Sequence, residues 1–321
     1  MVELVNITKL YHKKPVVNDV SLLVPKGQTL VLLGKSGSGK TTLLKMINRL
    51  IEPDEGNILI DGENIANRSV EELRRNIGYV IQAIGLFPHW TVAQNIATVP
   101  ALIGWPKNKT SSRVSELLEQ MGLPPRFASR YPHELSGGQQ QRIGVARALA
   151  GNPSLLLMDE PFGALDPIIR KEIQSDFQHL SIFKEMTKIV VTHDVKEAFY
   201  LGDEVALIDE GKIIEKATPR NFLFNSTSNL VKGFIGEDAW SLKLSQVALS
   251  EVISFLAFAK DSAEEVLICH TDEKPFSRIF SMVNSDQQQV KIIDDSGLVG
   301  HAFVGDLKAS FLKFESQLAA D

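Results

Sequence analysis

The feature of this sequence that most restricts its fold is a glycine-rich loop between a short apolar run and a helix-like stretch. The loop, residues 34–41, fits the pattern G-x-x-x-x-G-K-[ST] and follows the strand-like run Thr29–Leu33. Glycines allow successive backbone N–H groups to turn toward an anion, and the N-terminus of the following helix adds a partial positive charge. The pattern therefore predicts a nucleotide phosphate site, in which Lys40 reaches the β- and γ-phosphates and the Thr41 hydroxyl binds Mg²⁺.

Length and composition narrow the class of protein. The chain has 321 residues, enough for about two domains of ~100–200 residues each. Its 34 basic and 39 acidic side chains give a net charge of −5, which favours no nucleic-acid partner. The single cysteine, Cys269, excludes an internal disulfide and a cysteine-rich metal site. The longest apolar runs fall short of the ~20 residues of a membrane-spanning helix, and no signal peptide begins the chain, so we expect a cytoplasmic protein.

Strand-like and helix-like stretches alternate from residue 1 to about residue 235. Short apolar runs that lead into helices, such as Gln28–Leu33 followed by Lys40–Leu50, predict an α/β domain with a mostly parallel central sheet. The composition becomes polar at residues 225–229, and Gly233 and Gly236 follow. We therefore predict a domain boundary near Glu237, with a first domain at residues 1–236 and a small second domain at residues 237–321.

Two adjacent carboxylates follow the apolar run Leu155–Met158. In nucleotidases with a phosphate loop, a neighbouring strand delivers an Asp that holds the metal ion. Asp159 is therefore the candidate partner of Mg²⁺. Glu160 is the candidate base that orients and deprotonates the attacking water, a role worth ~10²–10⁴ in rate. Two acids after a buried strand can also cap the next element. The catalytic interpretation of Asp159 and Glu160 therefore depends on the phosphate loop being present in the same chain.

The stretch Leu135–Gln139 reads Leu-Ser-Gly-Gly-Gln and resembles the signature of ATP-binding cassette (ABC) ATPases. Other elements similar to that family occur in order over about residues 1–236. The segment Gly163–Asp166 resembles the loop that joins the two sites of the family's dimer. The resemblance implies an α/β, P-loop NTPase fold of the ABC nucleotide-binding type, followed here by a small C-terminal α/β domain.

The resemblance also implies roles for individual residues. Tyr11 occupies the place of the aromatic side chain that stacks on adenine, Gln82 that of the glutamine facing the membrane partner, and His193 that of the switch histidine at the γ-phosphate. The implied catalytic residues are Glu160, His193, Lys40 and Gln82, and the implied metal ligands are Thr41, Gln82 and Asp159. The implied ATP-binding residues are Tyr11, Gly34, Ser36, Gly37, Ser38, Gly39, Lys40, Thr41, Thr42, Ser136, Gly137, Gly138 and Gln139.

Residues 136–138 precede a helix-like stretch and form a second possible anion nest. One chain with one phosphate loop and one such nest can enclose ATP from both sides only if two copies pair head to tail. The family arrangement implies this homodimer, in which ATP drives closure and hydrolysis releases it.

Residues 72–92 and 95–100 closely resemble the ATPase subunits of osmoprotectant importers for glycine betaine, carnitine, choline and related quaternary amines. Their partners are transmembrane permease subunits and an extracytoplasmic solute-binding protein, which implies a place on the cytoplasmic face of the membrane. Phe87, Pro88 and Trp90 in this region could equally be packing residues. Two other interpretations stay open: an importer ATPase for another small solute such as an amino acid, and a soluble, non-transport ABC ATPase acting as a regulatory module.

The last 85 or so residues follow a β-α-β-β-α order that resembles one cystathionine-β-synthase-type (CBS) module. The expected elements are a strand at 266–269, a helix at 276–283, strands at 290–295 and 298–304, and a helix at 305–314. Nucleotide-binding modules carry a small hydroxyl residue three positions before an aspartate, but Phe303 stands there before Asp306. Nucleotide binding by this module is therefore doubtful. A role in dimerisation or in sensing through packing is at least as well supported, and the module could also be an appendage that only stabilises the chain.

Overall fold

The computed structural model describes residues 1–82, 85–180, 183, 185–256, 258–259, 267–272, 274, 276, 279 and 289–318. The chain divides into two compact units, Met1–Lys216 and Ala217–Asp321. Each unit has a hydrophobic core of its own.

The first unit is built on a six-stranded sheet with the strand order β10-β9-β3-β8-β7-β6. Strand β3 runs parallel to β8 and β9, and β7 runs parallel to β6 and β8. Every residue of β3 and of β7 is buried, as the uninterrupted apolar runs predict for central parallel strands. The strands are β3 (Thr29–Leu33), β6 (Ile77–Val80), β7 (Leu155–Asp159), β8 (Thr187–Thr192), β9 (Glu204–Asp209) and β10 (Lys212–Ala217).

A second, four-stranded sheet has the order β2-β1-β4-β5, and its strand pairs are antiparallel. Alternate residues of its long strands are buried, so one face of this sheet joins the core of the unit. Its strands are β1 (Val2–Tyr11), β2 (Lys14–Val24), β4 (Glu55–Ile60) and β5 (Glu63–Asn64).

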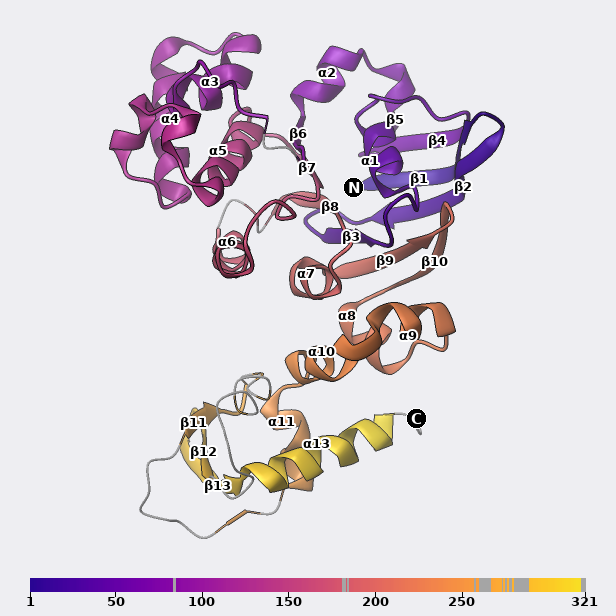
Figure 1. Cartoon of the computed structure of the whole chain (residues 1–321), viewed down its shortest axis with the longest axis vertical. Coiled ribbons are helices and arrows are strands. Elements are labelled where there is room, and N and C mark those ends of the chain that lie inside the picture. Colours follow the sequence, from indigo (N-terminus) through magenta and orange to yellow (C-terminus); the bar gives the residue numbers. More distant parts are fainter. Residues whose placement is uncertain are drawn as a thin grey trace. The chain divides into compact units, whose positions relative to one another are not determined.

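Helices pack on both sides of these sheets. Helix α1 contacts β2, β7 and β8, whereas α5 contacts β6 and the helices α3, α4 and α6 (Figure 1). Helix α1 ends at Ile47 and not at the predicted Leu50, because Asn48 leaves the helical region and Arg49 has a positive φ of 48°. The helices are α1 (Lys40–Ile47), α2 (Val70–Arg75), α3 (Val92–Leu102), α4 (Lys107–Gln120), α5 (Gly137–Leu149), α6 (Pro167–His179) and α7 (Val195–Leu201).

The second unit combines short helices with a three-stranded sheet of the order β11-β12-β13, in which β11 and β12 are parallel and β12 and β13 antiparallel. Its elements are α8 (Pro219–Phe224), α9 (Asn229–Ile235), α10 (Ala239–Gln246), α11 (Leu249–Val252), β11 (Leu267–His270), β12 (Gln289–Asp294), β13 (Gly297–Phe303) and α13 (Val304–Leu318). The strands and the last helix lie where the sequence predicts them. The helix predicted at 276–283 falls mostly outside the described residues.

The division into units comes at Lys216, before the boundary that the sequence predicts near Glu237. Helix α8 packs against α10, which is why residues 217–236 group with the second unit although their composition is polar. The assignment of functions to residues 1–236 and 237–321 stays a prediction. In the part of the chain that the structure describes, no helix has both the length and the apolar character needed to cross a bilayer.

Candidate functional site

The loop between β3 and α1 has backbone positions that only glycine fits well. Gly37 and Gly39 have φ values of +80° and +102°, in the left-handed region. A Cβ on Gly39 would lie 2.4 Å from the Val16 carbonyl oxygen, and one on Gly34 would lie 2.2 Å from that of Ile208. The loop is thus held between β2 and β9 in a shape that a side chain at either glycine would disrupt.

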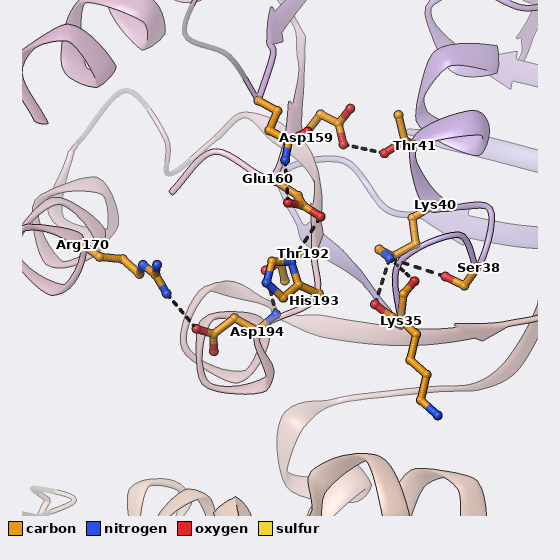
Figure 2. A network of polar contacts seen from close by, with 12 residues as sticks. Lys35, Ser38, Lys40, Thr41, Asp159, Glu160, Arg170, Thr192, His193 and Asp194 are labelled. Atoms are coloured by element: carbon orange, nitrogen blue, oxygen red, sulfur yellow. Dashed lines mark hydrogen bonds and ion pairs between the residues drawn. The ribbon is translucent and has the colours of Figure 1, made fainter. Parts of the chain in front are cut away.

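Lys40, at the start of α1, is 4 % exposed and closes this loop. Its Nζ donates to the carbonyl oxygens of Gly34 and Lys35, both at 2.8 Å, and to the Ser38 hydroxyl at 3.4 Å (Figure 2). Burial lowers the pKa of the Lys40 ammonium, while the nearby Glu160 and Asp159 act in the opposite direction. The loop therefore presents a partly desolvated cation at the N-terminus of a helix, as an anion site requires.

Thr41 and Asp159 bring two oxygen atoms together at the carboxyl end of β7. The Thr41 hydroxyl donates to Asp159 Oδ1 over 2.8 Å, and Figure 2 shows the two side chains pointing toward one another. Burial raises the pKa of the Asp159 carboxyl, and the Thr41 hydrogen bond and the Lys45 charge oppose that rise. Hydroxyl and carboxylate oxygens are the ligands that Mg²⁺ prefers, so the donor set fits this ion.

Glu160 stands at the centre of a second group of polar side chains. Its Oε2 accepts a hydrogen bond from Gln82 Nε2 at 3.0 Å, and its Oε1 lies 3.2 Å from His193 Nδ1. The residue has a positive φ of 46°, and its N–H donates to the Val191 carbonyl oxygen at 2.9 Å. Strained backbone of this kind concentrates at functional sites. Residues from three distant parts of the chain therefore meet at one carboxylate.

The segment that carries His193 is fixed by its neighbours. Asp194 accepts from the Glu197 N–H and so caps α7, while its own N–H donates to the Thr192 hydroxyl at 3.0 Å. Arg170 of α6 forms an ion pair of 3.2 Å with Asp194 and also donates to the Leu165 carbonyl oxygen (Figure 2). The loop 163–166 and the His193 segment are thus joined through one arginine.

Tyr11 lies at the end of β1 and is 43 % exposed. It pairs with Lys14 across the hairpin, where His12 and Lys13 both have positive φ. Strand β2 of this hairpin approaches Gly39 at Val16. The exposed ring therefore belongs to the hairpin whose second strand touches the phosphate loop.

Residues 136–139 form the start of α5. Helix α5 packs against β6 and other helices, whereas α1 packs against β2, β7 and β8. The Ser136 hydroxyl accepts from the Gln139 N–H, and Gln139 Oε1 accepts from the Ser136 N–H, which completes a capping box. A Cβ on Gly138 would lie 2.7 Å from Ile169 of α6, so this glycine allows α5 and α6 to pack closely.

Comparison with known proteins places this geometry in a family. The ABC transporter family model matches residues 17–163. The osmoprotectant import ATP-binding protein OsmV of Salmonella typhimurium is 44% identical over 304 residues, which cover 92% of this chain and 77% of that protein. The chain belongs to the ABC transporter family. The resemblance and the cassette fold that the sequence predicts are thereby confirmed.

Other relatives of this ABC chain agree. The choline transport ATP-binding protein OpuBA of Bacillus subtilis is 52% identical over 239 residues, 74% of this chain and 63% of that protein, so the match spans less than two thirds of that relative's length. Among solved structures, a dimeric ATP-binding cassette in a post-hydrolysis state with ADP and Pi is 33% identical, with a TM-score of 0.60, and is matched over 68% of this chain and 98% of its own.

A loop precedes the cassette's α3, and a groove lies beside this helix. Asn95 is fully buried; its Oδ1 accepts from the Phe87 N–H, and its Nδ2 donates to carbonyl oxygens of Phe87, Trp90 and Thr91. The Phe87 and Trp90 rings lie 4.6 Å apart and are each more than 40 % exposed. Phe87 also lines a groove of about 380 Å³ with Arg74, Tyr79, Thr98 and Arg147, among others.

Sequence reasoning missed three residues of this cassette: Asn95, Arg170 and Glu197. Each lies in a segment for which the sequence predicts a helix or a motif. Its structural role, however, depends on burial or on a contact with a residue far away in the chain, and neither can be seen in the sequence. Only one had a local signal, since Asp194 and Glu197 have the spacing of a helix cap and its third residue.

Proposed function

We propose that this chain is the ATP-hydrolysing subunit of an ABC importer that takes up osmoprotectants such as glycine betaine, carnitine or choline. The observation that carries this proposal is the extent of the likeness to the osmoprotectant import protein. Its 304 aligned residues exceed the length of the cassette unit, so the likeness includes residues of the second unit. A general cassette match would support ATP hydrolysis but would say little about the transported solute.

ATP would bind with its phosphates in the loop 34–41. Lys40 is buried and donates only to loop oxygens in the described residues, so its ammonium is poised for the β- and γ-phosphates. The loop backbone and the helix N-terminus supply the remaining donors, from Gly34, Ser36, Gly37, Ser38, Gly39, Thr41 and Thr42. The exposed Tyr11 ring would stack on the adenine.

Thr41 and Asp159 would hold Mg²⁺, with Gln82 as a further oxygen ligand. The existing contact between the Thr41 hydroxyl and Asp159 supports this assignment, because both oxygens already point to one place. When bound, the ion neutralises charge that develops on the phosphate oxygens.

Glu160 would act as the general base. It would take a proton from the attacking water while the bond between the γ-phosphorus and the leaving oxygen of ADP breaks. Gln82 and His193 both contact this carboxylate and would fix its orientation. His193 would also contact the γ-phosphate and so sense whether ATP is intact.

The partner in the closed state would be a second copy of this chain. Residues Ser136, Gly137, Gly138 and Gln139 sit at the N-terminus of α5, which packs against other elements than α1 does. We infer that they complete the ATP site of the other copy, head to tail. The dimeric state of a solved relative supports this inference.

The permease subunits would dock on the loop around Phe87 and Trp90 and on the groove beside it. Two exposed aromatic rings on a loop fixed by a buried asparagine make a preformed apolar anchor. This docking would place the chain on the cytoplasmic face of the membrane, and a solute-binding protein would act from the other side. We further propose that residues 237–321 form a CBS-like domain for regulation or dimerisation.

Uptake of labelled glycine betaine, carnitine and choline tests the osmoprotectant proposal. It would be measured in cells with the natural chain, without it, and with Glu160→Gln, at low and high external osmolarity. We expect uptake only with the natural chain and more of it at high osmolarity. Loss of amino-acid uptake alone would favour the importer of another solute. No uptake defect and no permease in a membrane pull-down would favour a non-transport ATPase.

A further inference from the structure

The loop at residues 163–166 is bound on two sides to residues near the candidate ATP site. On one side, the Gly163 N–H donates to the Glu160 carbonyl oxygen at 3.2 Å. On the other side, the Leu165 carbonyl oxygen accepts a hydrogen bond from Arg170 Nη2 at 3.1 Å. The loop therefore connects the candidate general base with a cationic side chain in the first part of α6.

Arg170 also holds the segment that carries His193. Its Nη1 forms an ion pair of 3.2 Å with Asp194, and Figure 2 shows the Arg170 side chain pointing toward this carboxylate. The two side chains are 26% and 31% exposed, so the pair is partly shielded from water and salt. A guanidinium presents several N–H groups in a fixed plane, and one such side chain can therefore hold two segments at once.

These contacts close a ring around the candidate catalytic groups. His193 Nδ1 lies 3.2 Å from Glu160 Oε1, which joins the His193 segment back to the general base. The ring runs from Glu160 through the loop 163–166 to Arg170, and from there through Asp194 to His193. A shift of the loop would therefore act on the base through Gly163 and on the imidazole through Arg170.

The same loop and the start of α6 lie beside the N-terminus of α5. A Cβ on Gly137 would lie 3.7 Å from a methyl carbon of Leu165, and one on Gly138 would lie 2.7 Å from Ile169. Under the proposed function, residues 136–139 bind the nucleotide of the second copy. A nucleotide bound there would thus contact the helix end against which Leu165 and Ile169 pack.

We propose that Arg170 is a positioning residue that couples the two ATP sites of the dimer. ATP held by residues 136–139 of one chain sets the position of His193 in the other site, to which that same chain contributes its phosphate loop. The proposal rests on the proposed function, which places residues 136–139 and His193 in different composite sites. Each step between them is a packing contact, a hydrogen bond or an ion pair, as coupling through a contiguous network requires.

ATP turnover of the full chain, measured over a range of ATP concentrations, tests this coupling. For the natural chain we expect a Hill coefficient above 1, up to the limit of about 2 for two sites. Arg170→Lys keeps the charge, but one ammonium cannot reproduce the two contacts of the guanidinium. We expect its Hill coefficient to fall to about 1 and its kcat to fall about tenfold, since a misplaced catalytic group costs rate. Lys171→Ala removes an exposed cation from the same helix and should change neither value.

Two further measurements separate coupling from structural support. In a Glu160→Gln background, Arg170→Lys should leave ATP-driven dimer formation unchanged, because the substitution affects the position of His193 and not the binding of ATP. Asp194→Asn keeps the oxygen that caps α7 but removes the charge that Arg170 meets. Added to Arg170→Ala, it should bring little further loss of turnover, because both changes break one contact. If Arg170→Ala does not fold, the Hill coefficient of Arg170→Lys still decides the test.

A natural chain without cooperativity, or an Arg170→Lys variant that keeps the natural Hill coefficient, would overturn the proposal. Full additivity of Arg170→Ala and Asp194→Asn would overturn it as well, and so would loss of dimer formation in Arg170→Lys. Failure of the proposed function is distinguishable from these results. In that case the natural chain itself shows no ATP turnover, whereas failure of this inference leaves that turnover intact.

Discussion

At the scale of single residues, the candidate site is centred on the Glu160 carboxylate, whose backbone is strained. Glu160 has a left-handed backbone that its N–H bond to Val191 and the Gly163 N–H bond to its carbonyl oxygen hold in place. This conformation directs the side chain to Gln82 and His193. Such a strained backbone costs ~1–3 kcal/mol, so contacts with the surrounding structure must stabilise this conformation.

Glu197→Gln should change how stability depends on pH. Burial raises the pKa of this carboxyl to about 8, so the folded chain keeps a proton on Glu197 up to that pH, whereas the unfolded chain releases it near the ordinary value of 4.5. The free energy of unfolding therefore falls as the pH rises from about 5 to 8, by roughly 3–5 kcal/mol from this group. Urea unfolding at pH 5 and pH 8 should show that Glu197→Gln loses this part of the slope. Equal slopes for the two chains would contradict the assignment.

Residues named by a local motif could be predicted from the sequence. The pattern of residues 34–41 identified Lys40 and Thr41, and the acids after an apolar strand identified Asp159; the structure brings Thr41 and Asp159 into contact. Glu197 could not be predicted, because its spacing from Asp194 indicates a helix cap but says nothing about burial. Burial depends on β3 and α6, which come from elsewhere in the chain, as well as on the neighbouring β8.

At the scale of elements, α3 organises the loop before it. Asn95 reaches back from the first turn of α3 and forms hydrogen bonds with backbone groups of Phe87, Trp90 and Thr91. The Thr91 hydroxyl and Gln94 form a capping box at the same helix end. The exposed rings of Phe87 and Trp90 are therefore presented by a loop whose backbone is fixed.

Asn95→Ala should separate transport from ATP hydrolysis. The substitution removes the four hydrogen bonds that the Asn95 side chain forms with the loop backbone and should lower the free energy of unfolding by roughly 2–4 kcal/mol. We expect weaker co-purification with the permease and lower solute uptake, with basal ATP turnover within about threefold. Asn76→Ala, at the exposed asparagine that follows α2, is the matched control. Normal permease binding by a folded Asn95→Ala would contradict this account of the loop.

At the scale of the whole molecule, the chain has two units with separate cores. The first is the ABC cassette, whose parallel order the alternating apolar runs predicted correctly. The structural division comes before the predicted boundary, because polar composition at residues 225–229 does not reveal that α8 packs on α10. The core of the second unit includes Phe276 and Phe311, whose rings lie 5.3 Å apart.

Phe311→Ala should affect the second unit and spare the first. The side chain is fully buried and also contacts Trp240, so its removal should cost about 3–5 kcal/mol of local stability. Hydrogen exchange should show lost protection in β12, β13 and α13, with protection of β3 and β7 retained. Basal ATP turnover should stay within about twofold. Simultaneous loss of protection in β3 and β7 would show that the units do not have independent cores.

The most direct test of the central claim is ATP hydrolysis by the purified full chain with and without Glu160→Gln. Phosphate release and ATP binding would be measured on the same preparations. We predict that the natural chain hydrolyses ATP, and that the variant binds ATP with similar affinity, stays in the closed dimer and hydrolyses it ~10²–10⁴ times more slowly. Near-normal turnover by the variant would contradict the role of Glu160 as the general base.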